Sequence, residues 1–284
     1  MTLFCLLNTL KLKAAFYIPV TNSQTEGLCQ LIEVADHAVS FIWYRKDPWE
    51  LAGLAVYHLN EPLSASAWEK LVRVETELPS NPARTQIIYN VKESTLVPDE
   101  FYQDGQASDI LTLLFGPNIA CTTHTISLSG IDARLIYRTP KALDNALRLI
   151  YPGSLFTHAS IQEVSVWKDF PADLQVVFYP QSIKLALFIH GKLQVIRYLP
   201  YQTATDAAYH LLHTARQHGK DAADIRVRLS GMIEKQSPLF NELYSYFPNI
   251  LFDDIGPLWT LPEGMSAYPE HYFSHLTTLA TCVS

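Results

Sequence analysis

The same order of strand and helix patterns occurs twice along this chain, and this repetition constrains the fold more than any other feature. Three segments of the first copy, 28–34, 38–45 and 51–59, are short and rich in β-branched and aromatic residues, which is typical of strands. A helical pattern follows over 64–79, and another strand pattern over 85–91. The first copy therefore predicts the order β-β-β-α-β.

The second copy begins about 146 residues later and repeats this order. Its strand patterns cover 174–180, 182–189, 193–200 and 225–231, its first helix begins near Thr203 and stops at Gly219, and its second helix begins at Ser237-Pro238. A last helix is predicted over 269–280. Because both copies share one order of elements, the chain is predicted to be an internal duplication.

Local signals refine the boundaries of the helices. Ser66 and Glu69 have capping-box spacing at the start of the first helix, and Thr139 is the predicted N-cap of a helix over 140–150. Between the two copies the sequence also predicts a helix over 108–115 and two strands, over 125–128 and 133–137. The segment that carries Pro98 is predicted to be a loop.

Composition excludes several classes of protein. The chain has 284 residues, of which 48% are apolar and 17% are charged. A typical soluble domain carries about 25% charged residues, so this sequence has ample material for a core and does not fit intrinsic disorder. The net charge of −7 and the isoelectric point near 5.8 argue against nucleic-acid binding, which needs a basic face.

Cysteines and apolar runs indicate a cytoplasmic protein. The four cysteines are far apart and form no Cys-x-x-Cys pair, which excludes a zinc ribbon and favours scattered buried thiols; they are Cys5, Cys29, Cys121 and Cys282. The first residues lack a basic region before the apolar run, so no signal peptide is predicted. No run reaches the ~18 uncharged apolar residues of a membrane helix, so we expect no membrane insertion.

Three segments, 29–44, 185–231 and 268–282, resemble a bacterial domain-of-unknown-function family with an actin-like fold. The resemblance implies an α/β protein with the duplicated ribonuclease-H-like fold of actin, sugar kinases and heat-shock chaperones, in which two β-β-β-α-β-α halves face each other across a cleft. The expected division is an N-terminal extension over 1–27, a first half over 28–170 and a second half over 171–284. The family has no established activity.

Active members of that superfamily hold ATP and Mg²⁺ between the halves, in two Asp-x-Gly-x-Ser/Thr hairpin turns and beside a strand that ends in Gly-Gly. The turn after the first strand here contains Asp36 but no glycine. The second turn, Pro180-Gln181, has no acid, and its proline removes a backbone donor. Ser230-Gly231 supplies one glycine of the final pair. Asp36, Ser230 and Gly231 are therefore weak candidates for a vestigial nucleotide site.

Other polar groups are interpreted as structural. Cys121 and His124 are separated by an odd spacing on a predicted strand and so point to opposite faces. The histidine pairs 210/213 and 271/275 have no nearby third ligand or glutamate base, so neither is interpreted as a metal site. Asp253 and Asp254 follow a predicted strand, at its carboxyl end. The basic cluster of the sequence consists of Arg216, Lys220, Arg226 and Arg228. Solvated side chains are the favoured interpretation of both.

These observations favour a non-catalytic binding or scaffold protein of the actin-like fold with no expected cofactor. Low charge together with abundant aromatic residues, among them Trp43, Tyr44, Trp49, Trp167 and Trp259, suits the centre of a protein interface. The expected partner is another protein or a second copy of the chain. Two alternatives remain open: a divergent ATP- and Mg-dependent phosphotransferase or ATPase using the cleft, and a structural subunit of an obligate dimer.

Overall fold

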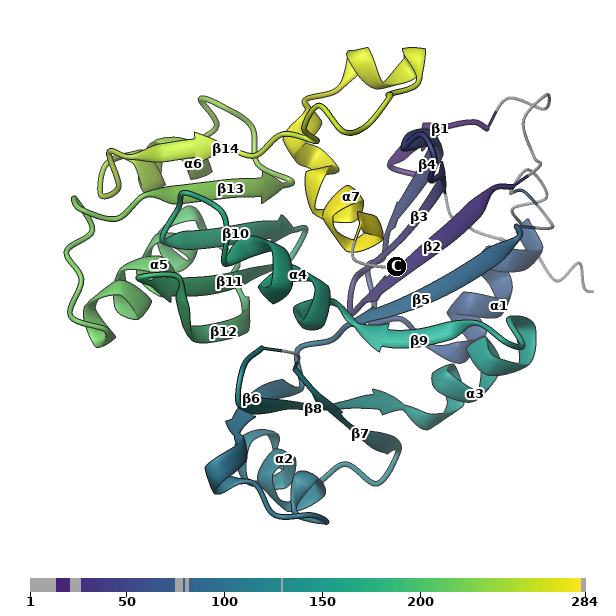
Figure 1. Cartoon of the computed structure of the whole chain (residues 1–284), viewed down its shortest axis with the longest axis horizontal. Coiled ribbons are helices and arrows are strands. Elements are labelled where there is room, and N and C mark those ends of the chain that lie inside the picture. Colours follow the sequence, from purple (N-terminus) through teal and green to yellow (C-terminus); the bar gives the residue numbers. More distant parts are fainter. Residues whose placement is uncertain (1–13, 21–26, 75–78, 80–81, 129, 282–284) are drawn as a thin grey trace, which may run out of the picture.

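The computed structural model describes residues 14–20, 27–74, 79, 82–128 and 130–281, without the side chains of 72–74. Two mixed sheets lie beside each other, each flanked by helices, and a smaller sheet projects from the first (Figure 1). Residues 75–78 of the first predicted helix, Cys5 and Cys282 lie outside the described residues.

The first half is built on a sheet of order β1-β4-β3-β2-β5-β9. Its central strands are antiparallel hairpin neighbours, whereas β5 and β9 run parallel to β2. The elements are β1 (Phe16–Ile18), β2 (Cys29–Ala35), β3 (Ala38–Arg45), β4 (Glu50–His58), α1 (Ala65–Val74), β5 (Arg84–Asn90), α3 (Lys141–Ile150), β9 (Leu155–His158) and α4 (Ala159–Trp167).

The second half repeats this topology with the order β12-β11-β10-β13-β14. Its elements are β10 (Leu174–Tyr179), β11 (Ser182–Ile189), β12 (Lys192–Pro200), α5 (Ala204–Gln217), β13 (Val227–Gly231), α6 (Pro238–Tyr244), β14 (Ile250–Phe252), the 3₁₀ turns η2 (Glu263–Ala267) and η3 (Glu270–Tyr272), and α7 (Ser274–Thr281). Antiparallel and parallel pairings follow the same sequence as in the first half. The predicted duplication is thereby confirmed at the level of strand order.

An inserted unit separates β5 from α3. It consists of β6 (Ser94–Pro98), η1 (Asp99–Phe101), α2 (Ala107–Phe115), β7 (Cys121–Ser127) and β8 (Ala133–Pro140). These strands form the sheet β6-β8-β7, and α2 packs on it through Ala107 and Leu111, which contact Val97 and Ile136. The prediction of a loop at Pro98 was wrong. Proline is tolerated there because β6 is an edge strand.

The two halves exchange helices. Helix α7, at the end of the second half, packs Leu276 and Leu279 against Leu31 and Ile88 of the first sheet. Helix α4, which follows the first sheet, packs Trp167 against the second sheet. The two helices contact each other between the sheets (Figure 1). Each half therefore supplies part of the core of the other, which ties them into one body.

Two predicted helix caps were wrong, one was confirmed at Ser237, and the helix predicted to begin near Thr203 does so. Ser64, not Ser66, caps α1, because its Oγ accepts the Ala67 amide at 3.2 Å. Thr139 lies in β8, and α3 starts after Pro140 without a side-chain cap. Thr203 caps α5 in a capping box, and Ser237 caps α6 with proline at its first turn.

A helix must be both long and apolar to cross a membrane. None of the helices in the described ranges is long and apolar enough to cross a membrane.

Gly231 marks a close backbone contact between β13 and β10. It has φ +78°, and a Cβ at this position would lie 2.2 Å from the Phe178 carbonyl oxygen. The next amide, that of Met232, donates to the same oxygen at 2.8 Å. A side chain at 231 would therefore push the two strands apart.

We predict that Gly231→Ala lowers the free energy of unfolding by about 3 kcal/mol or more, since both an unfavourable φ and a backbone clash result. Gly219→Ala is the matched control, because Gly219 has φ +68° but a Cβ added to it would meet nothing within 4 Å. That control should lose only about 1–2 kcal/mol. Urea denaturation measures both, and equal losses would contradict the clash.

Candidate functional site

The first hairpin turn places Asp36 at the edge of the boundary between the halves. Its carboxylate accepts a hydrogen bond from the Lys92 backbone amide, and burial raises its pKa against the opposing charge of Lys92. The turn itself is held by main-chain bonds, since the Asp36 carbonyl accepts the Leu63 amide at 2.9 Å. Asp36 is thus engaged by neighbouring residues of its own half.

The second hairpin and the end of β13 meet around a very small cavity. This cavity has a volume of about 20 Å³, close to the space of one water, and Ala38, Tyr179, Pro180 and Met232 are among its lining residues. Asp36 and Ser230 do not line it. Ser230 is buried beside Val177 in the parallel pairing of β10 and β13. The structure therefore does not bring the three sequence-predicted site residues to one common cavity.

Buried polar side chains fill the space between the hairpins instead. We call them the inter-half cluster: Glu33, Ser40, Asn90, Glu163, Tyr179, Lys184 and His275. The first three come from the sheet of the first half, Tyr179 and Lys184 from the second sheet, and Glu163 and His275 from the exchanged helices α4 and α7. All seven are buried.

Hydrogen bonds join the halves directly within this cluster. Tyr179 donates its hydroxyl hydrogen to Glu33 Oε1 at 2.6 Å, and Asn90 Nδ2 donates to the same oxygen at 2.9 Å. Asn90 also accepts from Lys184 Nζ at 3.0 Å through its Oδ1 atom. One amide side chain therefore links a carboxylate of the first half to an ammonium of the second.

The other carboxylate oxygen of Glu33 is also engaged. Ser40 Oγ donates to Glu33 Oε2 at 3.2 Å, and His275 Nε2 lies 3.8 Å from that atom. Burial lowers the pKa of His275, while the charge of Glu33 opposes this shift. Burial also raises the pKa of the Tyr179 hydroxyl, and nearby Glu33 and Glu163 raise it further. Tyr179 is therefore a hydrogen-bond donor here and not a phenolate.

Strand periodicity explains why these residues converge. Glu33 shares a face of β2 with Leu31, and Asn90 shares a face of β5 with Ile88; this face packs against α7. Ser40 and Lys184 are each the third residue of the return strand in their hairpin, so the duplication places them at equivalent positions. The cluster therefore follows from the repeated topology.

Lys184 and Glu163 form a completely buried ion pair. Their side chains are 2% and 0% exposed, and Lys184 Nζ contacts Glu163 Oε2. Burial raises the pKa of Glu163 and lowers that of Lys184, while the charge of each partner opposes the shift of the other. His158, whose pKa is held well below its usual range by burial and by Lys184, is neutral beside them. An unpaired charge at either position would be costly.

Sequence reasoning missed this cluster although a signal was present. Glu33 and Lys184 are charged residues inside strands that are otherwise apolar, and buried charges must be paired. Their partners lie far away in the sequence: Tyr179 is 146 residues from Glu33, and Asn90 is 94 residues from Lys184. The strand pattern alone could therefore flag Glu33 and Lys184 but could not join them.

The remaining candidate groups are structural. His124 Nε2 hydrogen-bonds to Thr139 Oγ1 at 2.9 Å, and Cys121 and Cys29 are free thiols. Asp253 is not solvated as predicted: it is buried against Arg228, whose Nε donates to it at 2.7 Å. Among the described residues, no group of three or more histidine, cysteine or acidic side chains is placed to hold a metal ion.

The aromatic residues predicted to form an interface are largely core. Trp43, Tyr44, Trp167 and Trp259 are at most 7% exposed, and Trp49 stacks against Tyr44. One group of exposed apolar side chains lies instead on the inserted unit, where Leu113 is 86% exposed and Ile119 is 92% exposed. The sequence-based assignment of an interface to the tryptophans was therefore wrong in its residues.

The repeated strand order and the helices exchanged between the halves define a protein of the actin-like ATPase fold, duplicated and ribonuclease-H-like. The chain belongs to the family described as "Protein of unknown function (DUF3822)", whose family model matches residues 19–250. No curated protein matches the sequence at a significant level.

Solved structures place the chain in the same fold. A Bacteroides thetaiotaomicron protein with actin-like ATPase fold and unknown function superposes with a TM-score of 0.73 at 16% identity, covering 91% of this chain and 97% of that one. The PilM–PilN type IV pilus biogenesis complex gives a TM-score of 0.57 at 11% identity, covering 91% and 99%. At these identities the likeness concerns the fold alone.

We predict that Lys184→Met lowers the free energy of unfolding by about 3–5 kcal/mol, because Glu163 is left as an uncompensated buried carboxylate. The double variant Glu163→Gln, Lys184→Met should recover most of that loss, since it removes both charges. Chemical denaturation of the three proteins measures these values. A double variant no more stable than Lys184→Met would contradict a charge-based origin.

The loss of unfolding free energy caused by Lys184→Met should also depend on pH. Without Lys184, the raised pKa of Glu163 rises further in the folded state, whereas its unfolded value is ordinary. A group with a raised folded pKa stabilises the fold below its unfolded pKa and loses that effect as pH rises through the folded value. The stability difference between wild type and Lys184→Met should therefore be smaller near about pH 5 than near about pH 8. A stability difference that does not change with pH would contradict an origin in the buried charge of Glu163.

Proposed function

We propose that this protein is a non-catalytic, cytoplasmic member of the actin-like fold that acts by binding another protein. The observation that carries this proposal is that the inter-half cluster fills the space between the hairpins and leaves a cavity of about 20 Å³ there. A larger pocket of about 840 Å³ adjoins this cavity at Met232 and Tyr272, but no residue of either hairpin turn lines it. Ligand pockets for molecules of nucleotide size have volumes of roughly 300–1,000 Å³. A nucleotide with its phosphates between the hairpins would have to displace Tyr179 and its bond to Glu33.

The residues at the turns also fit magnesium and phosphate poorly. The first turn has no glycine for close backbone approach, and Pro180 has no N–H to offer. The ammonium of Lys184 already supplies a buried positive charge between the halves and is paired with Glu163. Gly231 is accounted for by its contact with the Phe178 backbone. We infer that Asp36, Ser230 and Gly231 are remnants of a nucleotide site.

The inserted unit supports a role in protein binding. Leu113, Leu114 and Phe115 at the end of α2 and Ile119 after it are exposed and close together in the sequence, and exposed apolar groups of this kind suit an interaction site. Their position on a projecting unit leaves them accessible without any change in the body (Figure 1). The structural similarity to a PilM–PilN complex agrees with such a role for this fold, as an analogy only.

Thermal unfolding with Mg-ATP tests the proposal. A ligand present at 100 times its Kd adds about 2.7 kcal/mol of stability, which corresponds to a shift of several degrees for a protein of this size. We expect no shift of the melting temperature with millimolar Mg-ATP or Mg-ADP relative to Mg²⁺ alone.

Asp36→Ala is the matched variant, because the superfamily pattern makes Asp36 the carboxylate that would order the metal. A clear shift with Mg-ATP that disappears in Asp36→Ala would contradict the proposal and favour the divergent ATPase. Light scattering of the same samples decides whether the partner is a second copy of the chain.

A further inference from the structure

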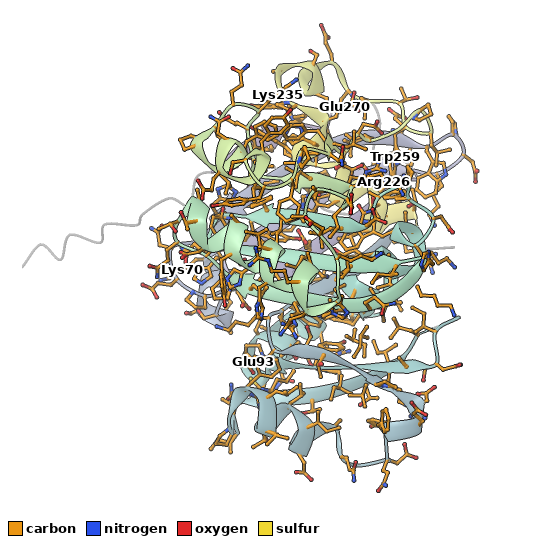
Figure 2. The ribbon with its side chains drawn as sticks, turned by 90° about the vertical axis from the view of Figure 1, so that its left-hand side faces the viewer. Lys70, Glu93, Arg226, Lys235, Trp259 and Glu270 are labelled. Atoms are coloured by element: carbon orange, nitrogen blue, oxygen red, sulfur yellow. The ribbon has the colours of Figure 1, made fainter. Side chains whose placement is uncertain are left out.

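A groove of about 650 Å³ lies between the inserted unit and the sheet of the second half, beside the place where β6 contacts β12. One wall is β12, and the other is β6 together with the end of α2 (Figure 1). Glu93, labelled in Figure 2, lies where the inserted unit meets the body, and it is paired with Arg138. The groove is distinct from the inter-half cluster.

The β12 wall of this groove presents main chain as well as side chains. Every residue over 193–199 lines the groove, although side chains alternate between the faces of a strand. A groove can contact each consecutive residue when it runs along the edge of the strand. Sheet pairing engages β12 on one side, with β11, so its other edge presents backbone donors and acceptors.

The opposite wall offers apolar contacts to a segment lying along β12. Leu96 of β6 and Leu114 and Phe115 of α2 line it, and the last two are 54% and 41% exposed. The groove therefore continues into the exposed apolar surface of the inserted unit. An extended segment on the β12 edge would direct alternate side chains towards these residues.

Charge distinguishes the two ends of the groove. Lys92 and Arg197 both line it, and Arg197 lies beside Ser94, the first residue of β6, in an adjoining small cavity. Asp132 lines the other end, next to the chain that follows β6. Lys92 also faces Asp36, whereas Arg197 is exposed and forms no salt bridge within the described residues. An acidic side chain of a ligand would complement Arg197.

We propose that this groove binds an extended peptide segment of a partner protein, which adds as a strand to the free edge of β12. The segment carries apolar side chains at alternate positions, directed towards Leu96, Leu114 and Phe115, and an acidic residue beside Arg197 and Lys92. This proposal rests on the proposed binding function and specifies its partner.

Selection from a library of random linear peptides displayed on phage, with the full chain as target, tests it. Enriched peptides should carry apolar residues at alternate positions together with an acidic residue. Hydrogen exchange measured with and without a synthetic copy of an enriched peptide should show protection over 193–199. Absence of enriched peptides, or protection confined to other segments, would overturn the proposal.

Two variants in the groove and one control variant test where the peptide binds. Leu114→Arg and Arg197→Glu change exposed side chains and should each weaken peptide binding by about tenfold or more in fluorescence polarisation. Leu251→Arg is the matched control, because Leu251 is 51% exposed on β14, at the opposite edge of the same sheet. The affinity of the Leu251→Arg variant for the peptide should stay within about twofold of the wild-type value. Equal effects of all three variants would overturn the assignment to this groove.

Two further outcomes separate this inference from the proposed function. Self-association of the chain that is abolished by Leu114→Arg would assign the groove to a second copy and overturn the peptide proposal. Mg-ATP binding lost in Asp36→Ala would contradict the non-catalytic function while leaving the peptide measurements valid. The two proposals can therefore fail independently.

Discussion

The hydrogen bond from Tyr179 to Glu33, and the buried ion pair of Lys184 and Glu163 beside it, constrain how the two halves can sit. Asn90 links both interactions, so the Tyr179 hydroxyl and the Lys184 ammonium of the second half obtain these partners only when the first half is present. Buried polar groups without partners cost several kcal/mol each. The cluster therefore favours this arrangement of the halves, and the helices α4 and α7 add apolar contacts around it.

Two features of this structure lie in different places: the space between the two hairpin turns, and the exposed apolar surface of the inserted unit. The superfamily pattern seen in the sequence places a nucleotide between two hairpin turns. Here those turns keep their places in the topology, and side chains of both sheets meet between the halves. One group of exposed apolar side chains lies on the inserted unit, away from the hairpins. Binding through that unit requires no opening of the halves.

The fold was predictable because its signals are local and repeated. Hairpin strands such as β2 and β3, and caps such as Thr203 and Ser237, follow from short-range pattern and backbone chemistry. Weak local signals gave the errors: β6 contains Pro98, and the short β9 and α4 were not predicted. The cap of α1 shifted by two residues, because Ser64 and Ser66 offer the same chemistry.

The site was much less predictable than the fold. Asp36, Ser230 and Gly231 were chosen from a superfamily pattern, and the structure places them in separate local settings. Glu33, Asn90, Tyr179, Lys184 and Glu163 converge through tertiary contacts between residues that belong to both halves, and no spacing in the sequence encodes such contacts. Asp253 illustrates the same limit, since its burial against Arg228 depends on a neighbouring strand.

A crystal structure determined in the presence of Mg²⁺ and a non-hydrolysable ATP analogue tests the central claim most directly. The account predicts that Tyr179 still donates to Glu33, that Lys184 still contacts Glu163, and that no nucleotide lies between the hairpins. Nucleotide bound there, with Tyr179 and Lys184 displaced towards its phosphates, would contradict the account and establish the cleft as a working nucleotide site.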